Sequence, residues 1–130
     1  MVQLRIVGTP KPQGSKRVFN GRVVEAAGNA LKVWRKQIAD ACLAQVNEDH
    51  RLMLGPVRVE VDFYLERPKT VKRSMPIVPP DVDKLARGLL DGIGQSEVVW
   101  GDDSQVVELI ARKEYADVIE PGAFITITEL

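Results

Sequence analysis

The sequence predicts a single α/β domain over residues 1–130, with a mixed β-sheet of about four main strands plus a small hairpin, packed with two main helices. Three observations carry this prediction. A chain of 130 residues has the length of one ordinary domain. Several short segments alternate apolar and polar residues, as strands with one buried face do. Two longer segments place apolar residues at helical spacing instead.

The elements follow one another in the order strand, hairpin, helix, strand, long loop, helix, strand, strand. Alternation predicts the main strands at 2–7, 56–66, 105–115 and 123–129, with a turn at 117–122 between the last two. The Asn20-Gly21 pair predicts the hairpin over 18–24. Helical spacing predicts one helix over about 29–46, and a second from Asp81 to a stop at Gly92 and Gly94.

The composition is that of a globular protein from a reducing compartment. Hydrophobic residues make up 45% and charged residues 28%, both ordinary values. Cys42 is the one cysteine, so no intramolecular disulfide can form, and its place on the apolar side of the first helix predicts a packed thiol. Neither a signal peptide nor a run of transmembrane length is present. We therefore expect a cytoplasmic protein with no membrane contact.

Charge is balanced overall but divided along the chain. Residues 1–80 carry 14 Lys and Arg against 7 Asp and Glu, whereas residues 81–130 carry 4 against 11. A basic half can bind phosphates while an acidic half holds a metal ion. Chance asymmetry that folding mixes over the surface is the competing interpretation.

The most informative stretch runs from residue 79 to residue 103. Asp81 and Asp83 stand at the start of the second predicted helix, where either can cap the exposed N–H groups. Arg87 follows Asp83 at the i+4 spacing that makes helix neighbours. A second acidic pair, Asp102 and Asp103, precedes a strand. Carboxylates from these two places, in a chain with a single histidine, indicate a site for a hard divalent cation.

The chemistry of such a site follows from its donors. Asp81, Asp83 and Asp103, with Asp102 as a further candidate, could bind one or two Mg²⁺ ions. The ion would activate a bound water and stabilise the leaving oxygen of a phosphoryl displacement. Arg87 could stabilise charge on the scissile phosphate, or could pair with its acidic helix neighbours. Helix caps and surface ion pairs are the plain alternative for all these acids.

Two basic loops are candidates for contact with a phosphodiester backbone. The first holds Lys11, Lys16 and Arg17; its glycine and lysine spacing departs from a P-loop, so no nucleotide cofactor is expected, and an ordinary solvated loop is the alternative. The second is long and proline-rich, carries Lys69, Lys72 and Arg73, and runs directly into Asp81. Loops of that length in compact domains are usually functional or disordered.

Together the motifs resemble a known family. They are Pro80-Asp81-x-Asp83-Lys84-Leu85-x-Arg87-x-x-Leu90-Asp91-Gly92, then Trp100-x-Asp102-Asp103-x-Gln105-Val106, and upstream Pro12-x-Gly14-Ser15-Lys16-Arg17. This pattern resembles the RusA family of Holliday junction resolvases, many of them phage- or prophage-encoded. The resemblance implies a homodimeric, Mg²⁺-dependent endonuclease, with Mn²⁺ as a substitute, that resolves four-way DNA junctions in recombination and repair by paired symmetric nicks leaving 5′-phosphate ends. It assigns Asp81, Asp83 and Asp103 as the metal-binding catalytic acids.

The chain departs from the family pattern at two positions. Arg87 stands where the best-studied relative has a catalytic lysine; it keeps the positive charge but does not readily donate a proton. Lys84 stands where the family often has asparagine, and could supply an amine or contact DNA instead. The substrate range could extend to flap DNA. The other hypotheses are a catalytically silent protein that binds branched DNA, and a phosphohydrolase acting on nucleotides.

Overall fold

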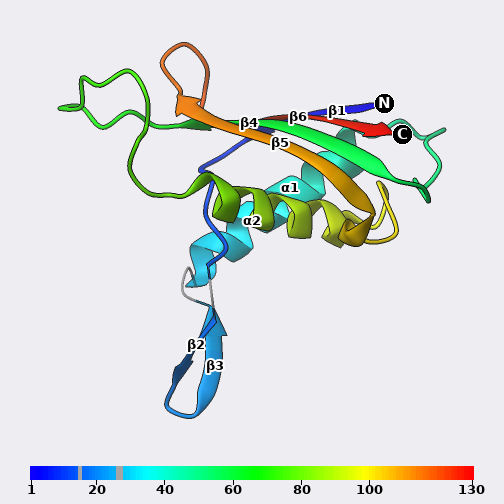
Figure 1. Ribbon diagram of the computed structural model, residues 1–130, viewed down its shortest axis with the longest axis horizontal. Helices are drawn as coiled ribbons and strands as arrows, with labels where there is room; N and C mark the ends of the chain where they lie inside the picture. Colours follow the sequence, from blue (N-terminus) through cyan, green and yellow to red (C-terminus); the bar gives the residue numbers. More distant parts are fainter. Residues whose placement is uncertain (15, 26–27) are drawn as a thin grey trace.

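The computed structural model describes residues 1–14, 16–25 and 28–130 of the chain (Figure 1). In chain order the elements are β1 (Val2–Val7), β2 (Lys16–Phe19), β3 (Arg22–Glu25), α1 (Gly28–Gln45), β4 (Val57–Leu65), α2 (Val82–Ser96), the 3₁₀ turn η1 (Asp103–Gln105), β5 (Val106–Tyr115) and β6 (Gly122–Glu129). The predicted α/β class, the four main strands, the hairpin and the two helices are therefore confirmed.

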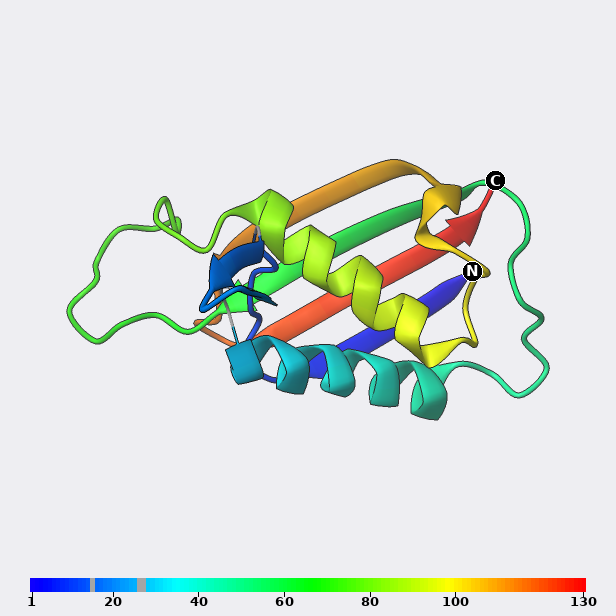
Figure 2. The same cartoon turned by 90° about the horizontal axis from the view of Figure 1, so that it is seen from below.

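The main sheet is mixed and has the order β1-β6-β4-β5. β6 pairs antiparallel with both β1 and β4, whereas β4 and β5 are parallel and are joined through α2. The predicted turn at 117–122 does not close a hairpin, because β4 lies between β5 and β6. Both helices cover the same face of this sheet, which gives a two-layer fold (Figure 2).

The core lies between the sheet and its helices. β4 alternates as predicted: Val57, Val59, Val61 and Phe63 are fully buried, and the intervening residues are not. Trp34 and Ile38 bring the apolar side of α1 into the same core. Burial of this alternating set fixes the register of the sheet, because a slip by one residue would turn it toward solvent.

The predicted hairpin forms a separate two-stranded sheet, β2-β3, which projects away from the helices in Figure 1. Asn20 and Gly21 both have positive φ, 50° and 75°, as the tight turn between twisted strands requires. Lys16 and Arg17 lie in β2, but their side chains fall outside what the structure describes.

The predicted end of the second helix at Gly92 and Gly94 is wrong. α2 continues to Ser96 and ends at Glu97, which adopts the left-handed conformation with φ 60°. Gly92 is buried against α1, and an added Cβ there would lie 2.9 Å from the Cβ of Ile38. This glycine permits close contact of the two helices, and that packing outweighs its weak helix propensity.

On the sheet face away from the helices, β4 and β5 carry paired charges. Arg58 donates to Glu108 at 2.8 Å, and Arg112 contacts Asp62 at 2.7 Å and also pairs with Glu60. These cross-strand pairs leave no large apolar patch on this face of β4 and β5. Among the residues that the structure describes, no helix combines the length and apolar character needed to cross a membrane.

Candidate functional site

The first acidic pair lies at the start of α2, as predicted, but it does not cap the helix. Asp81 occupies the N-cap position with extended backbone, and its side chain makes no capping hydrogen bond. Its nearest ionic partner is Lys84, with Nζ 3.4 Å from Oδ2. The Asp83 side chain is exposed and makes no hydrogen bond or ion pair with the described residues. Both carboxylates thus keep oxygen lone pairs for another ligand.

The loop that leads into Asp81 is held by a lysine from the sheet. Lys113 Nζ donates hydrogen bonds to the carbonyl oxygens of Val78, at 2.8 Å, and Pro80, at 2.9 Å. Sequence analysis missed this residue, although a signal existed. Lys113 faces the same side of β5 as Leu109 and Ala111, and a cation in such an inward row needs a polar partner.

Arg87 and Asp91 do not form the ion pairs along α2 that their i+4 spacing predicts. Arg87 is exposed and forms no ion pair with a described residue. Asp91 instead accepts a hydrogen bond from Gln13 Nε2 at 2.5 Å and lies 3.9 Å from Arg35. The alternative in which Arg87 pairs with its acidic helix neighbours therefore does not hold, and its guanidinium faces solvent.

The two residues of the second acidic pair differ: Asp102 caps a turn, whereas the carboxylate of Asp103 is available to a ligand. Asp102 accepts a hydrogen bond from the Ser104 backbone N–H at 2.9 Å. The Ser104 hydroxyl and, to a smaller extent, this N–H lower the pKa of the Asp102 carboxyl. Gln105 completes the cap by accepting from the Asp102 N–H at 2.9 Å, and its amide anchors η1 to the Met53 and Gly55 carbonyls. Asp103 is exposed and is bonded to none of the described side chains. Asp103 is thus the better candidate ligand of the two.

The two acidic pairs lie at opposite ends of α2. This helix has 15 residues, and at about 1.5 Å per residue it spans about 22 Å. β5 gives a similar value for this separation. Val106 lies beside η1 and Lys113 contacts Pro80, and between these two residues the strand advances about 23 Å at about 3.3 Å per residue. Accordingly, no group of three potential metal ligands occurs among the described residues of one chain. The expected convergence of Asp81 and Asp83 with Asp103 does not take place within a single chain.

The N-terminal basic loop lies against α2. The Gln13 N–H donates to the Lys84 carbonyl at 2.9 Å, and the Gln13 side chain also accepts from Arg35 at 3.0 Å. Gly88 permits this approach, since an added Cβ would lie 3.3 Å from the Lys11 carbonyl oxygen. The loop therefore brings Lys11 to the helix that carries the first acidic pair. The network of Gln13, Arg35 and Asp91 was not predicted, because no local pattern signals it.

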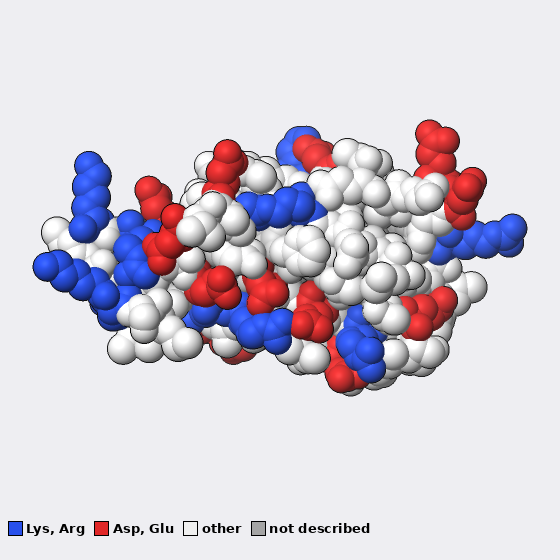
Figure 3. All heavy atoms as spheres, turned by 90° about the horizontal axis from the view of Figure 1, so that it is seen from above, with Lys and Arg blue, Asp and Glu red and all other residues white. Residues whose placement is uncertain are grey.

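The long loop at 66–81 is organised by its first arginine. Arg67 donates to both carboxylate oxygens of Asp117, at 2.7 and 2.9 Å, which lowers the pKa of that carboxyl. It also donates to the carbonyls of Val71 and Arg73, and its guanidinium lies 4.2 Å from the centre of the Tyr115 ring. Lys69, Lys72 and Arg73 are exposed. Figure 3 shows Lys and Arg atoms gathered where this loop projects, in agreement with its predicted basic character.

Cys42 and His50 offer no alternative centre. Cys42 is fully buried, and burial raises the pKa of its thiol from 9.0 to about 11, so it is a poor nucleophile, as its predicted packed position implies. His50 lies with Nε2 3.3 Å from the Val99 carbonyl oxygen, in contact with the backbone. The carboxylates and cations described above therefore remain the candidates for chemistry.

Comparisons with known proteins identify relatives along the whole chain. The family model described as Endodeoxyribonuclease RusA matches residues 5–128. The chain is 28% identical over 143 aligned residues to the uncharacterized protein YqaN of Bacillus subtilis (strain 168), covering 99% of this chain and 96% of that protein. It is 30% identical over 111 residues to the methylenetetrahydrofolate–tRNA-(uracil-5-)-methyltransferase TrmFO of Exiguobacterium sp. (strain ATCC BAA-1283 / AT1b), covering 81% of this chain but 25% of that protein.

Proposed function

This chain belongs to the RusA family of endodeoxyribonucleases, and from that premise we propose that it is a metal-dependent endonuclease that resolves four-way DNA junctions by paired symmetric nicks. In each nick, water adds to phosphorus and the bond to the 3′ oxygen breaks. The products are a 5′-phosphate and a 3′-hydroxyl, and the proton lost by the water balances the one gained by the 3′ oxygen.

One observation carries this proposal: Asp81 and Asp83 have carboxylates free of capping bonds, between two basic loops. A stabilising role would leave Asp81 bonded to the N–H groups of α2, as helix caps usually are. The loop with Lys11 approaches α2 from one side, and the loop with Lys69, Lys72 and Arg73 leads into Asp81. Exposed acids beside cations suit a metal ion that meets a DNA phosphate.

The donor set fits Mg²⁺ better than softer metals. Asp81, Asp83 and Asp103 supply hard carboxylate oxygens, and neither cysteine nor histidine is near them in the chain. When bound, the ion would supply a more acidic water and charge stabilisation for the leaving oxygen. Mn²⁺ has the same preference for oxygen and is expected to substitute. Asp102 would orient η1 through its cap and would contribute less to metal binding than Asp103.

A homodimer would bring the first acidic pair of one chain close to the second acidic pair of its partner. β5 is an edge strand, since β4 is its neighbour in the sheet and no strand lies beyond it among the described elements. Two copies related by a two-fold axis, with β5 antiparallel to the partner's β5, would place the start of each strand beside the end of the other. The partner's Asp103 would then approach Asp81 and Asp83. Val107 and Leu109, 65% and 43% exposed on β5, would be covered in this arrangement.

The cations of the site would act by position and charge. Arg87 lies one turn beyond Asp83 on α2, where its solvent-facing guanidinium can approach the scissile phosphate without transferring a proton. Lys84 could supply the amine that Arg87 lacks. Lys11, Lys16, Arg17, Lys69, Lys72 and Arg73 would bind the DNA backbone. Their contribution should weaken as salt rises.

The test uses a labelled synthetic four-way junction and a matched linear duplex, each with and without Mg²⁺ or Mn²⁺. We expect paired nicks at symmetric positions in the junction alone, and only when a metal is added. Asp83→Asn should abolish nicking while junction binding persists. Asp40→Asn is the matched control, because Asp40 lies on α1 and pairs with Lys36.

The outcomes separate the hypotheses that the sequence leaves open. Junction binding by the parent protein without nicking in either metal would favour the catalytically silent binding protein. Nicking by Asp83→Asn at the parent rate would remove Asp83 from the site. Hydrolysis of free nucleotides, with no effect on either DNA, would favour the phosphohydrolase.

A further inference from the structure

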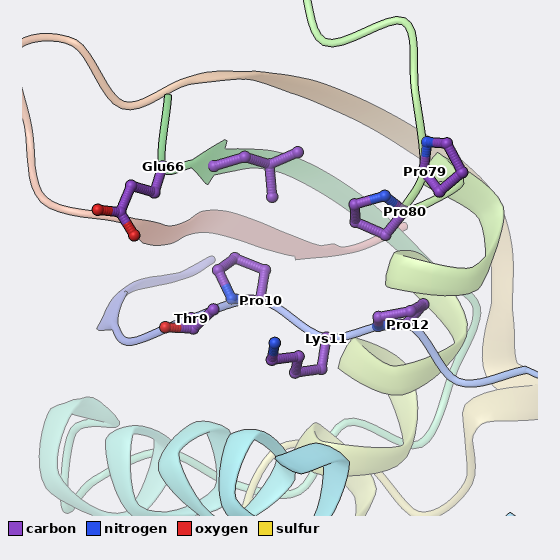
Figure 4. A pocket seen from close by; sticks show the side chains of 8 residues that line it. Thr9, Pro10, Lys11, Pro12, Glu66, Pro79 and Pro80 are labelled. Atoms are coloured by element: carbon purple, nitrogen blue, oxygen red, sulfur yellow. The ribbon is translucent and has the colours of Figure 1, made fainter. Parts of the chain in front are cut away.

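A cavity of about 430 Å³ opens beside the start of α2 (Figure 4). In Figure 4 the N-terminal loop forms one wall, the end of β4 with Glu66 forms another, and Pro79 and Pro80 close a third. Its lining residues are Thr9, Pro10, Lys11, Pro12, Leu65, Glu66, Pro79 and Pro80. Because Asp81 directly follows Pro80, one wall of the cavity ends at the first candidate metal ligand.

Hydrogen bonds fix two of the walls. The N-terminal loop is held at both ends, by the Gly8 N–H donating to the Pro121 carbonyl at 3.0 Å and the Gln13 N–H donating to the Lys84 carbonyl at 2.9 Å. Lys113 holds the opposite wall through the Pro80 carbonyl at 2.9 Å. The proline rings add stiffness, because proline fixes φ. The cavity is therefore formed before a ligand arrives, as small-molecule sites usually are.

From this arrangement we propose that the cavity receives one unstacked nucleobase of the DNA strand whose phosphate lies at Asp81. This inference rests on the proposed endonuclease function and names the part of the substrate that the cavity binds. Consecutive residues have Cα atoms about 3.8 Å apart, so Pro80 and Asp81 can contact the base and the phosphate of one nucleotide together. A base held here would fix the position of that phosphate before the nick.

The chemistry of the lining selects a base in preference to an anion. Four proline rings and Leu65 present apolar surfaces for the faces of a planar ring. Thr9 and Glu66 supply polar groups for its edge, and the Glu66 carboxylate can accept from an exocyclic amine. Lys11 and Glu66 bring opposite charges to the cavity, so it has no excess positive charge to hold a free phosphate. The cavity should therefore prefer adenine or cytosine to thymine.

Placing a base in the cavity should cost less free energy in branched DNA than in a continuous duplex. Extrusion of a base from a duplex costs free energy, and this cost is least where the base is already unpaired or poorly stacked. At the branch point each strand changes its stacking partner, so a base there should be extruded at lower cost than one in a continuous duplex. The cavity would thereby favour cutting at the branch point over cutting in linear DNA.

Fluorescence of 2-aminopurine provides the test, since this base brightens when it leaves the stack. Junctions carrying it at each nucleotide flanking the cut are mixed with Asp83→Asn protein in Mg²⁺, which the proposed function predicts to bind without cutting. No aromatic ring lines the cavity to quench the signal. We expect brightening at one flanking position. No brightening at any position would overturn the proposal.

Variants of the cavity make the test specific. Thr9→Phe, placed in the Asp83→Asn protein, adds a ring at the exposed rim that would either exclude the base or quench a base inside the cavity, so the brightening should be lost in both cases. In the otherwise unchanged protein it should slow nicking about tenfold, because the base would no longer fix the position of the phosphate. Val7→Phe is the control, because Val7 is exposed and does not line the cavity. Brightening that survives Thr9→Phe would contradict the assignment.

A second measurement does not depend on the folding of Thr9→Phe. With cytosine or thymine at the brightening position, the parent should nick the cytosine junction faster, and Glu66→Gln should reduce that preference about fivefold or more. An equal preference in parent and variant would contradict the role of Glu66 and of the cavity. Failure of the endonuclease function is seen separately, as absence of nicking by the parent on an unmodified junction.

Discussion

The side-chain amide of Gln13 donates a hydrogen bond of 2.5 Å to the carboxylate of Asp91, across 78 residues of sequence. Arg35 of α1 donates to the same Gln13 at 3.0 Å, so three segments meet at one polar cluster. This cluster fixes the N-terminal basic loop against the helix that starts at Asp81. It thereby joins a predicted DNA-binding segment to the predicted metal ligands.

Loss of this cluster should be measurable as loss of stability. Asp91→Ala removes the acceptor of the Gln13 amide and the carboxylate that lies 3.9 Å from Arg35. Because this place is partly buried, the free energy of unfolding should fall by about 1–2 kcal/mol in urea denaturation. Asp40→Ala, which breaks an exposed ion pair with Lys36, should cost less than about 0.5 kcal/mol. Equal effects of the two substitutions would show that the cluster contributes little.

The close contact of the helices predicts opposite effects of alanine at two glycines of α2. At Gly92 an added Cβ would lie 2.9 Å from the Ile38 Cβ, so Gly92→Ala should lower the free energy of unfolding by about 1–3 kcal/mol. At Gly94 the nearest atom would be 3.9 Å away, and Gly94→Ala should stabilise by about 0.5–1 kcal/mol. Thermal melts of both variants check this. A stable Gly92→Ala protein would refute the described packing of α1 on α2.

Burial of Cys42 predicts that its thiol reacts slowly and that the stability of the fold depends on pH. The pKa of its thiol rises from 9.0 to about 11 on folding, so the folded state keeps the proton longer than the unfolded state does. The contribution of the protonated Cys42 thiol to the free energy of unfolding is fully present below pH 9.0 and is lost as pH rises toward 11. Iodoacetamide at pH about 8 should label the urea-unfolded chain and spare the folded one. Rapid labelling of the folded protein would contradict the burial.

Local patterns predicted most of the fold. The alternation of β4, the apolar side of α1 and the Asn20-Gly21 turn each arise from contacts near in sequence, and each was placed correctly within a few residues. The end of α2 was misplaced because Gly92 follows a tertiary contact with Ile38 and not its own propensity. The separation of β5 from β6 by β4 likewise depends on long-range pairing.

The sequence pattern named the residues of the candidate site, but the expected convergence of these residues within one chain was wrong. The pattern identified Asp81, Asp83, Asp102 and Asp103, and the structure distinguishes Asp102 as a cap. A signal for their separation was present, because a helix of 15 residues carries the chain about 22 Å from its start. The alternation of β5 signals that Lys113 needs a polar partner, but it does not indicate that Pro80 supplies one. The contact of Gln13 with Asp91 joins distant segments, and no local motif indicates it.

The most direct test of the proposed function mixes two chains that are inactive alone. Asp81→Asn and Asp103→Asn proteins are refolded together and assayed on the four-way junction in Mg²⁺. If each site takes Asp81 and Asp83 from one chain and Asp103 from its partner, every mixed dimer holds one intact site. Random pairing should then restore about a quarter of the parent nicking sites, seen as single nicks. No nicking by the mixture, despite mixed dimers shown by mass spectrometry, would contradict a site shared between two chains.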